Sequence, residues 1–243
     1  MRILIRWIRF IVLFSSLCIA VSVYFLWARS LSGPLLLIRL TQTYALLALS
    51  YLYFALLATP LYLVFPRFPF QALYLKARRA LGVSAFLFAA LHGTIALFGL
   101  LGGPLKLIFL NSNYLIPVIF GQIALLILFI MAIVSFDYAV YKLGKKWKLI
   151  HRFVYLAGLL ILLHFLMIGS HFERPTLIFL IYTNAITILL TLEAIRFNRF
   201  IKEKFSRATR FFFLFLTFSI FLLYISYVYI PLPFLPRLNI HAH

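Results

Sequence analysis

Six histidines are the residues of this chain whose chemistry is least expected, because 65% of the sequence is hydrophobic. His92 and His164 each lie deep in an apolar stretch, and His151 lies at the basic edge of the stretch that contains His164. A buried imidazole without a partner costs free energy, so each ring needs a hydrogen-bond partner or a ligand. These three histidines are therefore the first candidates for a functional site.

The elements that must position these rings are membrane helices. Only 11% of the residues are charged and the mean hydropathy is +1.10, whereas soluble domains keep roughly a quarter of their residues charged. We expect an all-α, polytopic transmembrane helix bundle that forms a single integral membrane domain over residues 1–243. The sequence has no long polar stretch and no glycine-rich nucleotide motif, so we expect no built-in soluble catalytic domain.

Seven stretches are long enough to cross a bilayer, which takes about 20 apolar residues. They are residues 8–28, 38–64, 81–102, 114–136, 149–169, 175–195 and 211–230. Pro60 lies inside the second stretch, where we expect a kink.

The basic residues predict how these spans are oriented. Eighteen of the 23 lysines and arginines fall before the first span or in the alternate loops after it, and five fall on the other side. The positive-inside rule then places the N-terminus in the cytoplasm and, with seven spans, the C-terminus outside. The net charge of +19 is therefore interpreted as topology signals and contacts to anionic lipid headgroups rather than as a nucleic-acid surface.

The third and fifth spans run in the same direction, so the depths of their histidines can be compared. His92 lies thirteen residues past Arg79, and His164 lies sixteen past Lys148. At 1.5 Å per residue, both rings lie about 20–24 Å beyond their basic edge. Two imidazoles at one depth could bind one iron from opposite faces, as in a bis-histidine b-type haem.

Small residues near His92 are consistent with a bound macrocycle. Ala85, Ala96 and Gly99 fall within about 40° of His92 on an α-helical wheel, which predicts a groove. Two plainer interpretations stay open, namely that each histidine makes a helix–helix hydrogen bond and that the small residues only allow close helix packing.

The other histidines are harder to assign. His151 lies about 140° around the helix from His164 and about 19 Å from it, so it belongs to a separate site. It could bind an inner haem, touch a flavin or a haem propionate, or cap the basic edge. His171 near the outer surface and the terminal pair His241 and His243 are weak metal candidates.

Two segments carry a family resemblance. They read KARRALGVSAFLFAALHGTIALFGLLGG (76–103) and KLGKKWKLIHRFVYLAGLLILLHF (142–165). They resemble the ferric reductase-like transmembrane family, and within it the haem-binding membrane subunits of bacterial periplasmic methionine sulfoxide reductase systems. The resemblance covers residues 38–190, which we expect to form the haem-binding core. The family usually has a six-helix core, and the hydropathy span at 211–230 is then expected to be an additional C-terminal helix.

The resemblance implies a multi-pass protein of the bacterial inner membrane that carries one or two b-type haems and relays electrons outward. It also implies flavin mononucleotide as a further cofactor, a cytoplasmic flavin reductase or the quinone pool as donor, and a periplasmic molybdopterin enzyme as acceptor. His92, His151 and His164 match the haem-linked histidines of the family. Arg78 and Arg79 match its basic pair, which could hold propionates or a flavin phosphate.

The sequence lacks a flavin-binding HPF motif and a nucleotide domain, so we expect an electron-transfer subunit rather than a self-sufficient enzyme. Two alternatives remain at this stage. One is a ferric or cupric reductase acting at the outer face through His171 and the terminal histidines. The other is a transporter or assembly protein whose histidines only tie helices together.

Overall fold

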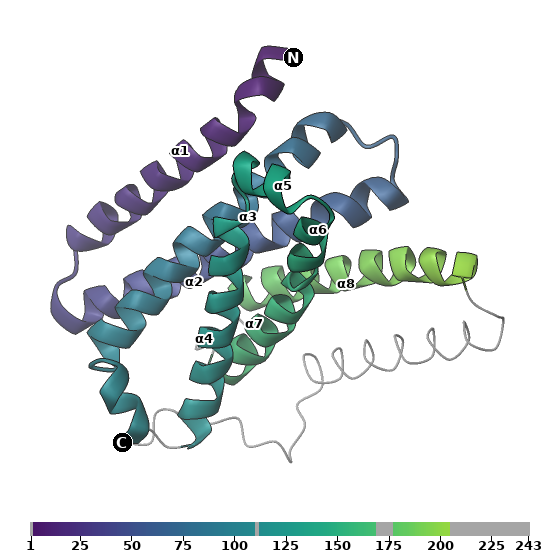
Figure 1. Cartoon of the computed structure of the whole chain (residues 1–243). Coiled ribbons are helices and arrows are strands. Elements are labelled where there is room, and N and C mark those ends of the chain that lie inside the picture. The colour runs from purple at the N-terminus through teal and green to yellow at the C-terminus, as the bar shows by residue number, and fades with distance from the viewer. Residues whose placement is uncertain (1, 110–111, 169–176, 205–243) are drawn as a thin grey trace. The chain divides into compact units, whose positions relative to one another are not determined.

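A computed structural model describes residues 2–109, 112–168 and 177–204, and within these ranges the chain is helical without strands (Figure 1). In the part of the chain that the structure describes, six helices are long and apolar enough to cross a membrane. The predicted all-α, polytopic membrane class is therefore confirmed. The seventh span at 211–230 lies outside the described residues, and it stays a prediction, as do the domain boundaries and the sidedness of the membrane.

The chain divides into two compact units. Of the described residues, the first unit comprises 2–55 and those between 72 and 168, and the second comprises Leu56–Gln71 together with 177–204. All three candidate histidines lie in the first unit. In the second unit, the Tyr62 hydroxyl donates to the Pro69 carbonyl across the turn that follows α2, and α8 spans Leu177–Lys204.

Three long helices begin the first unit: α1 (Arg2–Ala28), α2 (Gly33–Val64, which continues into the second unit) and α3 (Gln71–Thr94). Leu40, Tyr44 and Phe88 form a buried cluster against which α1 packs. Buried hydrogen bonds reinforce the contact, since Ser16 on α1 bonds Ser84 on α3 and the Tyr44 hydroxyl donates to the Ala20 carbonyl. These bonds provide hydrogen-bond partners for polar groups, which lipid tails cannot do.

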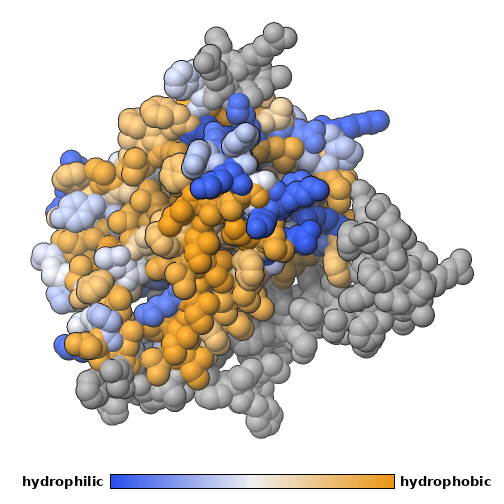
Figure 2. All heavy atoms as spheres, in the orientation of Figure 1, coloured by the Kyte–Doolittle hydropathy of each residue, from blue (hydrophilic) through white to orange (hydrophobic). Residues whose placement is uncertain are grey.

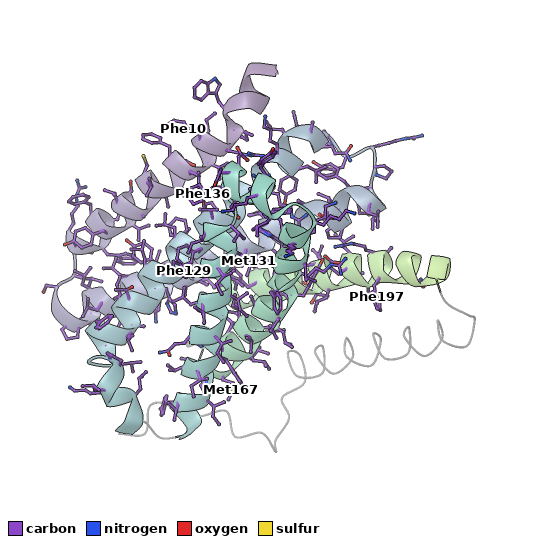
Figure 3. All side chains as sticks on the ribbon, viewed as in Figure 1. Phe10, Phe129, Met131, Phe136, Met167 and Phe197 are labelled. Atoms are coloured by element: carbon purple, nitrogen blue, oxygen red, sulfur yellow. The ribbon has the colours of Figure 1, made fainter. Side chains whose placement is uncertain are left out.

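The outer face of α1 is apolar. Phe10 is 60% exposed and Phe14 is 58% exposed, and Figure 3 shows such side chains projecting along the helix, with Phe10 labelled. Figure 2 shows that most of the surface coloured by hydropathy in this view is hydrophobic, as expected of a surface facing lipid.

Four helices follow in the first unit, and the last two of them carry His151 and His164. They are α4 (Ser112–Ile133), α5 (Asp137–Leu143), α6 (Lys145–Arg152) and α7 (Val154–Ile168). Helices α4 and α7 pack closely along their lengths. The first unit thus contributes α2, α3, α4 and α7 to the surroundings of the histidines.

Two predicted spans are not regular helices. The span predicted at 149–169 is interrupted at Phe153, between α6 and α7, so His151 and His164 lie on different helices. The span predicted at 81–102 starts earlier, at Gln71, and changes after Thr94 into a π-helix, Ile95–Leu100 (η1). A 3₁₀ helix, Pro104–Phe109 (η2), follows. By contrast, α2 continues through Pro60.

Candidate functional site

His92 on α3 and His164 on α7 lie next to each other in an edge-to-face arrangement. Their ring centroids are 6.1 Å apart and their planes are inclined by 77°. Both rings are partly buried. Residue counting predicted that the two rings lie at one depth, and in the structure the rings lie close together. We call His92 and His164 the histidine pair.

Each ring of the histidine pair is anchored to a neighbouring helix through Nδ1. His92 Nδ1 lies 3.0 Å from the carbonyl oxygen of Thr41 on α2, and His164 Nδ1 lies 2.7 Å from that of Pro117 on α4. A carbonyl oxygen can only accept, so Nδ1 must carry the proton in both rings. The neutral rings then keep a free lone pair on Nε2, the arrangement usual for metal-binding histidines.

The spacing of the histidine pair fits a metal ion between the rings. Two bonds of about 2 Å from imidazole nitrogens to a metal place the ring centroids about 6 Å apart, which agrees with the observed 6.1 Å. A pair of opposed histidines leaves the remaining coordination positions to a group with its own ligands, such as haem. Within the described residues, no group of three or more His, Cys, Asp or Glu side chains is placed to hold a metal ion.

Thr41 offers a second polar group beside His92. Its Oγ1 is buried and has no hydrogen-bond partner. The residue as a whole is only 9% exposed. By contrast, the hydroxyls of Thr43 and Ser50 on the same helix each donate to the carbonyl four residues earlier. The Thr41 hydroxyl is therefore a donor available to a bound group.

The predicted groove of small residues around His92 is only partly recovered. Ala85 is fully buried, but Ala96 and Gly99 lie in the π-helix. The α-helical offsets used to place them do not hold there, because a π-helix has more residues per turn. A Cβ on Gly99 would lie 3.2 Å from Leu37 Cδ1, so Gly99 faces α2.

His151 lies in a different environment, which we call the basic-end cluster: Arg9, Arg79, Ser135, Asp137, Trp147 and His151. The His151 ring stacks on Trp147, with centroids 4.0 Å apart. Its Nδ1 lies 3.1 Å from the Trp147 carbonyl oxygen, and its Nε2 lies 3.4 Å from Ser135 Oγ. The Arg79 guanidinium lies over the Trp147 ring, 5.5 Å from its centroid.

Asp137 joins two arginines in this cluster. It pairs with Arg9 at 2.9 Å and with Arg79. The hydrogen bond from Arg79 holds the pKa of this carboxyl below its usual value, partial burial opposes that shift, and the charge of Arg9 adds to it. One carboxylate thus connects α1, α3 and the start of α5. Figure 3 labels Phe136, which immediately precedes this helix.

The two predicted arginines point to different partners. Arg79 contacts the basic-end cluster, and it also donates to the Ser135 carbonyl at 3.3 Å. Arg78 Nε donates to the Ala55 carbonyl on α2 at 3.1 Å. His171, His241 and His243, the candidates for an outer metal site, lie outside the described residues.

Sequence reasoning missed several residues around the histidines. The carbonyls of Thr41 and Pro117 give no signal, since every residue has one. Trp147 could have been found, because it lies four residues before His151 and helical residues at this spacing face each other.

The chain is similar in sequence to a known protein family. Residues 41–162 match the family model described as "Ferric reductase like transmembrane component". This match includes His92 and His151 and ends just before His164. No solved structure shows a significant match to the chain.

Several curated bacterial proteins are similar as well. A Salmonella dublin protein-methionine-sulfoxide reductase heme-binding subunit MsrQ is 32% identical over 161 residues, which cover 63% of this chain and 72% of that protein. The MsrQ proteins of an Enterobacter species and of Cronobacter sakazakii are each 35% identical, over 49% of this chain. The matches span 59% and 58% of the length of those two relatives. The chain therefore belongs to the ferric reductase-like transmembrane family, and within it to the MsrQ type.

Proposed function

We propose that this chain is a transmembrane b-type haem protein that relays electrons between donors and acceptors on opposite sides of a bacterial inner membrane. The observation that carries this proposal is the histidine pair, with its 6.1 Å ring separation and both Nδ1 atoms engaged by carbonyls. The names of the MsrQ relatives, which are heme-binding subunits, support it.

His92 and His164 are the residues that would hold the haem iron, each through its Nε2. Haem supplies one-electron redox chemistry through its iron, so the protein needs to bind the group, orient it and exclude water. The Thr41 and Pro117 carbonyls fix the orientation and tautomer of the two rings. The helices around the pair keep it in an apolar environment, which influences the reduction potential.

His151, Arg78 and Arg79 are proposed to serve electron entry at the basic end of the helices. A second haem, flavin mononucleotide or a quinol could approach there, since arginine suits propionate or phosphate groups. The proposed donor is a cytoplasmic flavin reductase or the quinone pool. The proposed acceptor is an extracytoplasmic molybdopterin enzyme of the methionine sulfoxide reductase type, for which this chain acts as electron-transfer subunit.

The helix-tying alternative is supported by some of the same contacts as the haem proposal. The two Nδ1 bonds also tie α3 to α2 and α7 to α4, as the helix-tying interpretation requires. In the haem interpretation, Nε2 of each ring binds iron, whereas in the helix-tying interpretation it does not. The outer metal reductase depends on residues outside the described ranges.

The decisive experiment is a reduced-minus-oxidised absorption spectrum of the purified full-length chain, with haem quantified per chain. We expect a b-type spectrum that is lost in His92→Ala and in His164→Ala. His243→Ala serves as the control histidine and should leave the spectrum unchanged. A colourless wild type, expressed with ample haem, would rule out the electron-transfer function and leave the helix-tying one.

A further inference from the structure

Gly121 on α4 lies directly against the His164 ring. A Cβ added at this position would come within 2.9 Å of both Cε1 and Nδ1 of His164, and within 3.4 Å of Cγ. Carbon atoms do not approach this closely without a clash. Only a residue without a side chain therefore leaves the ring where it is.

The position of the ring is what allows its hydrogen bond. Pro117 precedes Gly121 by four residues, so the two lie on the same face of α4, one turn apart. His164 crosses over Gly121 to bring Nδ1 within 2.7 Å of the Pro117 carbonyl oxygen. A ring pushed outward by a methyl group would lose or lengthen this bond.

Two other helical glycines show that this closeness is not a general property of these helices. A Cβ on Gly82 would meet nothing within 4 Å, and one on Gly93 would meet only Leu125 Cδ2, at 3.2 Å. The end of a leucine side chain can rotate away. The His164 ring is held by its bond to Pro117 and has less freedom to move.

We propose that Gly121 is a positioning residue for His164. The missing side chain sets the place and the tautomer of the imidazole, and through them the strength with which Nε2 binds a metal. The effect of Gly121 on iron binding rests on the proposed haem function. Its effect on the position of the His164 ring does not. The two parts can be tested separately.

The first test compares Gly121→Ala with Gly82→Ala in the full-length haem protein. Loss of an outer hydrogen bond to a metal-binding histidine typically weakens metal binding about 10- to 100-fold. We expect Gly121→Ala to lose haem at least about 10-fold more readily, and to show a changed low-spin electron paramagnetic resonance signal. Gly82→Ala should match the wild type. Identical spectra and haem affinity for all three proteins would overturn the proposal.

The second test needs no haem. Glycine to alanine inside a helix normally stabilises a protein, by reducing the freedom of the unfolded chain. We expect Gly121→Ala to lower the thermal midpoint of haem-free protein, yet to raise it when His164 is already alanine. Such a reversal shows that residue 121 acts through the ring. If the penalty of Gly121→Ala persists without the His164 ring, the proposal is wrong.

These tests also separate the inference from the proposed function. If Gly121→Ala fails to fold alone, recovery of folded protein in Gly121→Ala/His164→Ala supports the inference and failure to recover contradicts it. A colourless wild type would remove the haem function, while the haem-free comparison would still decide whether Gly121 positions the ring.

Discussion

The histidine pair and the basic-end cluster use the same residue type in opposite ways. In the pair, neutral backbone carbonyls hold Nδ1 of each ring, and the two rings lie edge to face. In the cluster, His151 stacks on Trp147, and two arginines and a carboxylate lie around that stack. The first arrangement suits a metal ligand of fixed tautomer. The second places a titratable ring among charges, near the end of the helices where partners could approach.

The largest effect is expected when the His164 side chain is removed. It tests whether the histidine pair and the basic-end cluster are chemically different. In His164→Gly, free imidazole can enter the space left by the side chain, because Gly121 and the Pro117 carbonyl still shape it. We expect haem absorbance to disappear in His164→Gly and to return with millimolar imidazole.

His151→Gly provides the comparison for this rescue. We expect it to keep the absorbance of the histidine pair without added imidazole. Loss of all haem in His151→Gly would show that the two regions form one site, contrary to our interpretation.

A smaller effect is expected from removing the aromatic centre of the basic-end cluster. Trp147 stacks on His151, lies beneath Arg79 and donates from Nε1 to the Val134 carbonyl at 3.0 Å. Trp147→Ala should cost about 2–4 kcal/mol of stability, as large-to-small substitutions do. Thermal unfolding would measure this cost, and Trp147→Phe should lose less. The spectrum of the histidine pair should not change in either variant.

The Asp137 ion pairs should contribute less, since the Asp137 side chain is 78% exposed. Exposed pairs are worth about 1 kcal/mol or less. Because the pKa of folded Asp137 is lowered, its contribution is present above the unfolded value of 3.8 and is lost as the pH falls below it. Stability of wild type and Asp137→Asn, measured from pH 7 to pH 3, should converge at the acid end. A constant difference across this range would contradict the assignment.

The smallest effect concerns the Thr41 hydroxyl. Without a bound group this buried donor is unpaired, so Thr41→Val should be neutral or should stabilise the haem-free protein by about 1 kcal/mol. Thr43→Val is the matched control, because the Thr43 hydroxyl donates to the Arg39 carbonyl and accepts from Trp27 Nε1. It should destabilise. Equal losses in both variants would show that the Thr41 hydroxyl has a partner within the protein.

The sequence predicted the membrane helices well and their ends less well. Hydropathy located the six described spans, because lipid demands apolar residues along each. It placed the start of α3 ten residues late, at 81 instead of Gln71, because Lys76, Arg78 and Arg79 end an apolar stretch without ending a helix. The break at Phe153 and the π-helix were not predicted, since both change backbone hydrogen bonds among residues that stay apolar.

The proximity of His92 and His164 was predictable because helices have a fixed rise per residue. Their orientation was not, because it depends on two backbone carbonyls and on the missing side chain of Gly121. Asp137 was visible as a rare acid, but its bond to Arg79 joins residues 58 positions apart. Spacing along one helix can be counted, whereas contacts between helices require the fold.

The π-helix that follows His92 has a consequence for the phase of the residues beyond it. Its wider turn, closed by bonds such as that from the Leu101 amide to the Ala96 carbonyl at 2.9 Å, contains an extra residue relative to an α-helix. The residues beyond Thr94 are therefore rotated around the helix axis relative to the positions that a continuous α-helix would give them. His92 keeps the α-helical register of α3, while the chain that leads toward α4 starts from a different angle.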